Sequence, residues 1–105
     1  MELTIGNIRC EAQGALLGSV TPNVRAVNIQ FSEKQIIIHF YYHEKYSELE
    51  DEEAEMVGTE LISSFTDCML EVEKHIFPYP RKIPSQGILV YQRYEPLPQE
   101  SIDGI

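Results

Sequence analysis

Two histidines, His39 and His43, have the four-residue spacing with which a helix presents a pair of zinc ligands. The residues around them are β-branched and aromatic and predict a strand, in which four residues span about 13 Å. The two imidazoles would then share a face but lie too far apart to hold one ion. The zinc protease motif also needs Glu directly after the first histidine, where this chain has Phe40. The sequence therefore predicts no metal site here, and no cofactor.

Nucleophilic catalysis needs a Ser or Cys beside a base, and the sequence offers one such pair, Cys68 with His75. Seven residues of one predicted strand would place them on opposite faces and more than about 20 Å apart. The stretch Gly14–Gly18 resembles a phosphate-binding loop but lacks its Lys and Ser/Thr. No G-x-S-x-G motif occurs in the chain. The sequence therefore predicts no catalytic residue, so the protein is not expected to be an enzyme.

Carboxylates crowd the stretch from Glu48 to Glu60. A calcium loop needs alternating oxygens around a central Gly, whereas these acids lie in a predicted helix and would point to water. Two interpretations remain open, a solvated acidic face or a patch that steers a cationic partner, for which nearby tyrosines could be aromatic anchors. The residues predicted to bind a partner are Tyr42, Tyr46, Glu48, Glu50, Asp51, Glu52 and Glu55.

The overall charge has the same sign as this helix. Seventeen acidic residues against eight Lys and Arg give a net charge of −9 over 105 residues. Such a surface is repelled by nucleic acid and by anionic membranes, and a basic protein is its natural complement. Acidity that serves only solubility is the alternative. The N-terminus lacks a basic segment followed by an apolar one, and Cys10 and Cys68 suit reduced, buried thiols, so a cytoplasmic location is expected.

Periodicity predicts six elements that would position these groups. Apolar residues at helical spacing indicate a short first helix, and Ser47 with Glu50 indicates a capping box at the start of the second. Alternating or β-branched runs indicate four strands, the first two of which should pair antiparallel. A Pro-rich connection precedes the last strand. In order, the helix, two strands, helix and two strands span residues 4–19, 26–31, 35–42, 47–65, 68–77 and 87–94.

This order, α-β-β-α-β-β, predicts an α+β fold with a four-stranded antiparallel sheet and two helices packed on one face. No repeat or linker divides the chain. We expect a single domain over residues 1–95 and a flexible, Pro-containing tail over residues 96–105.

Several stretches of the chain resemble a group of small bacterial proteins. They are Gly14-Ala15-Leu16-Leu17-Gly18-Ser19-Val20-Thr21-Pro22-Asn23-Val24-Arg25-Ala26-Val27, Phe40-Tyr41-Tyr42, the Glu-rich helix and Gly87-Ile88-Leu89-Val90-Tyr91-Gln92-Arg93. Some proteins of this kind are similar to the immunity partners of polymorphic toxins, including those of contact-dependent growth inhibition. The resemblance implies a tight inhibitor of a cognate toxin and transfers no catalytic residue.

Two functions follow as hypotheses. In the first, the chain is an immunity protein, a monomer or weak dimer, that occludes the active site of a basic, nuclease-like toxin domain or a surface beside it. In the second, it is a homo-oligomeric or adaptor domain that associates through an exposed sheet edge, with residues 35–42 as the suspected edge strand.

Overall fold

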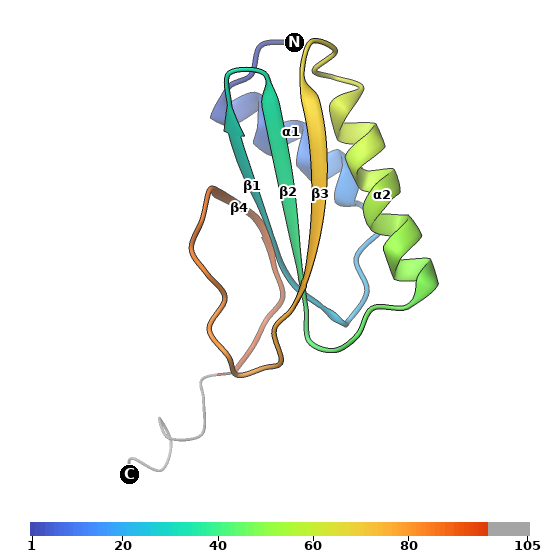
Figure 1. Cartoon of the computed structure of the whole chain (residues 1–105). Coiled ribbons are helices and arrows are strands. Elements are labelled where there is room, and N and C mark those ends of the chain that lie inside the picture. Colours follow the sequence, from blue (N-terminus) through green and yellow to red (C-terminus); the bar gives the residue numbers. More distant parts are fainter. Residues whose placement is uncertain (97–105) are drawn as a thin grey trace.

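The computed structural model describes residues 1–96 and has the predicted order of elements (Figure 1). The ends of five elements differ from the prediction by one to three residues, and the second strand matches it. The elements are α1 (Ile5–Leu16), β1 (Val24–Ser32), β2 (Gln35–Tyr42), α2 (Glu48–Ile62), β3 (Met69–Ile76) and β4 (Ile88–Gln92).

Both helices begin at a hydroxyl residue that caps free backbone amides. The Thr4 side chain accepts a hydrogen bond from the Asn7 amide at 3.1 Å. Ser47 and Glu50 form the predicted capping box, in which the Ser47 hydroxyl accepts from the Glu50 amide and the Glu50 carboxylate accepts from the Ser47 amide. Each cap satisfies donors that the first helical turn leaves unpaired, and therefore fixes where the helix starts.

The four strands form one sheet in the order β3-β2-β1-β4. β1 and β2 form the predicted antiparallel hairpin, in which Val27 lies opposite Phe40 and Ile29 opposite Ile38. β4 pairs antiparallel with the other side of β1. Because β1 and β2 have neighbours on both sides, they form the centre of the sheet and β3 and β4 form its edges.

The expectation of a purely antiparallel sheet is wrong, because β3 runs parallel to β2. The residues between these two strands, 43–68, contain α2, which returns the chain to the starting end of the sheet. A strand that follows such a helical crossover runs parallel to the strand before it. The sheet is therefore mixed, with one parallel pair and two antiparallel pairs.

The suspected edge strand is also corrected by this order. Residues 35–42 form β2, which lies between β1 and β3, so its backbone groups are paired on both sides. The edge available for strand addition on that side of the sheet belongs to β3.

Both helices pack on one face of the sheet, as predicted, and the core lies between them and the strands (Figure 1). α1 contributes Ile8 and Ala12, and α2 contributes Val57 and Leu61, each almost fully buried. The strand residues that meet them are mostly β-branched or aromatic: Val27, Ile29, Ile36, Ile38, Phe40 and Tyr42. Burial of these side chains provides the main driving force for the fold.

The opposite face of the sheet is partly covered by the Pro-rich connection between β3 and β4. Asn28 on β1 donates to the carbonyl of Pro84 at 3.1 Å, and Gln86 donates to the hydroxyl of Tyr41 at 2.6 Å. Tyr41 is therefore fully buried although it points away from the helices. We call this side of the sheet the open face. Of the predicted tail, all but Pro96 lies outside the described residues.

Gly87 ends this connection with a backbone φ of 72°, and a Cβ there would lie 2.2 Å from the carbonyl oxygen of Ile29. We expect Gly87→Ala to lower the free energy of unfolding by roughly 2–4 kcal/mol, because backbone atoms cannot yield as a side chain does. Gly14→Ala is the matched control, since a Cβ in α1 meets no atom within 4 Å. Urea denaturation should show it stabilised by about 0.5–1 kcal/mol. Equal stabilities of the two variants would contradict the close approach at Gly87.

Candidate functional site

The acids of α2 divide into those tied into the fold and those free to meet a partner. Glu50 belongs to the first group, since its carboxylate accepts hydrogen bonds from the Ser47 amide at 2.9 Å, from Asn23 at 3.3 Å and from the Thr21 hydroxyl. Burial raises the pKa of Glu50, but these hydrogen bonds outweigh it and hold the pKa below its ordinary value. Glu50 therefore anchors α2 to the loop before β1.

Asp51 and Glu55 also have a partner within the chain. Both bind the ammonium of Lys74 on β3, with a distance of 2.8 Å from Nζ to the Asp51 carboxylate. Burial lowers the pKa of Lys74, but hydrogen bonds to the two carboxylates more than compensate and raise it. This cluster clamps α2 to the edge strand and offsets one of the two negative charges at that point.

Glu48 and Glu52 remain exposed, and they share the outer side of α2 with two apolar side chains. Leu49 is 65% exposed and Met56 is 67% exposed. Residues three and four apart on a helix are neighbours, so these side chains form one continuous stripe with Glu60. We call Glu48, Leu49, Glu52, Met56 and Glu60 the α2 outer face.

The two predicted aromatic anchors are placed differently. Tyr42 is 1% exposed and belongs to the core, where burial raises its pKa and nearby Glu50 and Asp51 add to the effect. Its ring faces the helices because residue 42 shares the sheet face of Phe40. In the free chain Tyr42 is therefore part of the core and is not offered at the surface, and its predicted role in binding a partner stays a prediction. Tyr46 is half-buried against the core, and the ammonium of Lys45 lies 4.2 Å from its ring centroid.

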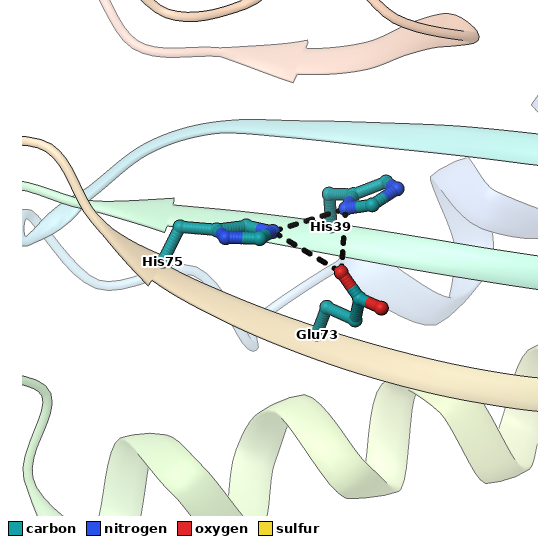
Figure 2. Close-up of side chains that lie close together, drawn as sticks. All are labelled: His39, Glu73 and His75. Atoms are coloured by element: carbon teal, nitrogen blue, oxygen red, sulfur yellow. Dashed lines mark hydrogen bonds and ion pairs between the residues drawn. The ribbon is translucent and has the colours of Figure 1, made fainter.

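A second cluster lies on the open face, where β2 and β3 meet (Figure 2). His39 Nδ1 lies 3.0 Å from His75 Nε2, and Glu73 Oε1 lies 3.5 Å from the former atom and 3.6 Å from the latter. His39 Nε2 donates to the Gln30 side-chain oxygen at 2.5 Å. The three ligand-type atoms thus converge on one point.

The environment of this cluster favours neutral His39. Burial lowers its pKa and outweighs the carboxylate of Glu73, while His75 lowers it further. Because Nε2 keeps its proton for Gln30, the lone pair of the neutral ring is on Nδ1 and points to the other two residues. The His75 ring is stacked on Tyr41 with 4.9 Å between centroids.

Reasoning along single strands missed this cluster. His43, the partner considered for His39, instead accepts a hydrogen bond from the Tyr79 amide. Cys68 precedes β3, whereas His75 lies near its end, so these two do not form a dyad. The sequence did indicate that Glu73 and His75 lie on the same face of β3, because they are two residues apart in a strand. It did not indicate that this face lies beside His39, which depends on the parallel register that pairs His39 with Glu73.

A cavity of about 530 Å³ lies between the open face and the 77–87 connection. Arg25 lines this cavity and is only 3% exposed. Its guanidinium makes a bidentate ion pair with the Glu95 carboxylate, with Nε 2.6 Å from Oε2 and Nη2 2.9 Å from Oε1. The same guanidinium donates to the carbonyls of Phe77 and Arg81, both at 2.7 Å. Arg25 thus holds the start of the connection and the segment after β4 together.

Neither helix in the described part of the chain has the length and apolar content needed to cross a membrane. These features define a small α+β domain in which one helix carries seven acidic residues and no Lys or Arg. A family model for the MafI2 immunity protein matches residues 6–95, and the chain belongs to this family. No curated protein matches the chain. Membership confirms the resemblance to bacterial immunity proteins of toxin systems.

The ion pair of Glu95 predicts a specific pH dependence of stability. Hydrogen bonds from Arg25, followed by those from Arg93, hold the pKa of Glu95 below its ordinary value against the effect of burial. The stabilisation is therefore fully present above the ordinary Glu pKa and is lost as the pH falls through the lowered one. We expect Glu95→Gln to be less stable than the wild type by roughly 1–3 kcal/mol at pH 7.

This difference should shrink as the pH falls from 7 through the lowered pKa of Glu95, and it should vanish once the Glu95 side chain of the folded wild type is protonated. Urea denaturation across this range measures it. Glu2→Gln, at an exposed position, is the control and should match the wild type throughout. A constant gap between Glu95→Gln and the wild type would show that the charge of Glu95 is not what stabilises Arg25.

Proposed function

We propose that this chain is an immunity protein that binds a cognate toxin domain and blocks it by covering its active site or a surface beside it. Family membership supports the immunity role. The proposed binding surface is the α2 outer face, and the observation that supports it is that exposed acids surround two exposed apolar side chains there. In this proposal the chain acts in the cytoplasm, without chemistry of its own, as a monomer or weak dimer.

The charge of α2 supports a basic partner. The helix has no Lys or Arg, and its acids are Glu48, Glu50, Asp51, Glu52, Glu53, Glu55 and Glu60. Lys74 offsets only part of this charge, and the whole chain adds to it with a net charge of −9. A nuclease presents a positive cleft to its nucleic acid, so an acidic helix is attracted to the surface that must be blocked. We therefore propose a nuclease-like toxin, as met in contact-dependent growth inhibition.

Leu49 and Met56 supply the apolar contact area that an interface needs in addition to charge. Exposed acids accelerate encounter but contribute little to residence time, whereas apolar side chains buried at the centre of an interface slow dissociation. The two lie seven residues apart, hence two turns along the same side of α2. Their position within a ring of acids matches the usual interface pattern of an apolar centre with a polar rim.

The first experiment recovers the partner. Tagged full-length chain is used to isolate bound proteins from its native bacterium, and each is expressed in cells with and without this chain. A basic fragment that kills cells only in the absence of the chain supports the proposal. Recovery of the chain alone, or of a harmless assembly, would overturn it. Sedimentation of the free chain at micromolar concentration tests the monomer or weak dimer.

With the toxin in hand, the double variant Glu52→Lys/Glu60→Lys tests steering. We expect its association rate constant to fall by roughly ten-fold or more at low salt, and to depend less on salt than that of the wild type, because electrostatic attraction is screened by ions. Stopped-flow mixing over a series of salt concentrations measures both. Glu2→Lys/Glu33→Lys changes the net charge equally at exposed sites outside α2. If the two double variants behave alike, α2 is not the steering surface.

The double variant Leu49→Ala/Met56→Ala tests the apolar anchors. Both side chains are exposed in the free protein, so folding stability should change by less than about 0.5 kcal/mol. The dissociation rate constant should rise at least ten-fold while association changes little. Leu17→Ala, at an 80% exposed position after α1, is the control. Surface plasmon resonance that shows unchanged dissociation in the α2 variant would remove these residues from the interface.

A further inference from the structure

We propose that His39, Glu73 and His75 form a binding site for a divalent transition-metal ion, with Zn²⁺ as the ion that suits it best. The site is separate from the α2 outer face and independent of the immunity role, because its side chains lie on the open face (Figure 2). Two imidazole nitrogens and one carboxylate oxygen are a ligand set that zinc proteins use when a fourth position is left for water.

Two of the three distances between the ligand atoms fit this ion. Zinc binds His nitrogen and carboxylate oxygen at about 2.0–2.2 Å, and tetrahedral angles then separate neighbouring ligand atoms by about 3.3–3.6 Å. The sides of the triangle formed by the three atoms measure 3.0, 3.5 and 3.6 Å. Right-angled octahedral coordination at the same bond lengths would need sides of about 2.8–3.1 Å, which two of the three exceed. The two sides that involve Glu73 therefore match tetrahedral coordination, whereas the side between the two histidines is shorter than the tetrahedral separation and would lengthen when an ion is bound.

The surroundings also suit a metal ligand. A histidine that binds metal usually donates its other ring N–H to an oxygen, which fixes the tautomer and aims the lone pair. His39 does this through Nε2 to the side-chain oxygen of Gln30. The stacking of His75 on the buried ring of Tyr41 restricts its orientation in the same way. Gln30 is thus a positioning residue for the site.

Access and position are compatible with reversible binding. His39 is nearly buried, but the side chains of Glu73 and His75 are 37% and 29% exposed, so an ion can enter from solvent. Its ligands come from two neighbouring strands, of which β3 is an edge strand paired on one side only. A bound ion would fasten this edge to the sheet and stabilise the folded state by mass action.

The site is tested by titrating the full chain, with its purification tag removed, with Zn²⁺ in the presence of excess Mg²⁺ to occupy the acidic helix. Isothermal titration calorimetry should show one ion per chain, and Zn²⁺ should raise the melting temperature relative to chelator. Cobalt(II) should give the visible absorption of a tetrahedral complex. Absence of saturable binding would overturn the proposal.

Variants locate the ion. His75→Gln and Glu73→Gln alter partly exposed side chains, so they should fold, and each should weaken Zn²⁺ binding by at least about ten-fold. Gln30→Leu should weaken it by roughly ten-fold while still binding one ion. His43→Gln removes a histidine outside the cluster and should bind as the wild type does. Equal affinity in His75→Gln and His43→Gln would show that Zn²⁺ binds elsewhere and that His39 and His75 form only a hydrogen-bonded pair.

Discussion

The crossover from β2 through α2 to β3 is the constraint on which the rest of this structure depends. Because α2 must carry the chain back along the sheet, β3 enters parallel to β2 and occupies its free side. The helix can lie close to that strand because Gly58 has no side chain, and a Cβ there would lie 2.8 Å from atoms of both Leu70 and Val72. Lys74 then joins β3 to the acids of α2. One packing arrangement therefore fixes the sheet order, the direction of the helix and the side of it that faces solvent.

The same helix serves as scaffold and as candidate binding surface, and its residues separate the two roles. Val57 and Leu61 face the sheet and hold the helix in place, while Glu50 ties its first turn to Thr21 and Asn23. Glu48, Glu52 and Glu60 contribute little to the fold, since their exposed carboxylates make no ion pair with another of the described residues. Their concentration on a helix without Lys or Arg therefore has an electrostatic cost within the chain that a basic partner would relieve. This cost is the physical reason to regard the α2 outer face as a binding surface instead of a merely solvated one.

Local sequence patterns were sufficient to predict the helices and strands, but they were insufficient to predict which strands lie side by side and in which direction they run. The Ser47–Glu50 capping box, the hairpin of β1 and β2 and the apolar stripe of α2 all depend on residues close in sequence, and the structure confirms them. The direction of β3 depends on how 26 intervening residues cross the sheet, since residues 43–68 separate it from β2. That α2 lay between two predicted strands was itself the signal for a parallel pair. The burial of Tyr42 was similarly available from its period of two with Phe40, whereas the meeting of His39 with His75 required the register between strands.

Alternation along β3 assigns successive residues to the two sides of the sheet. Lys74 points to α2 and neutralises part of its charge, whereas Glu73 and His75 point to the open face and meet His39. A slip of one residue in the pairing of β3 would exchange these sides, and it would remove the ammonium from Asp51 and Glu55 while burying a carboxylate against the helix. The lysine clamp thus enforces the register that brings the two histidines together. A change at the open face can consequently reach the acidic helix through β3, by way of the strand backbone and Lys74, so the two surfaces are chemically distinct but mechanically joined.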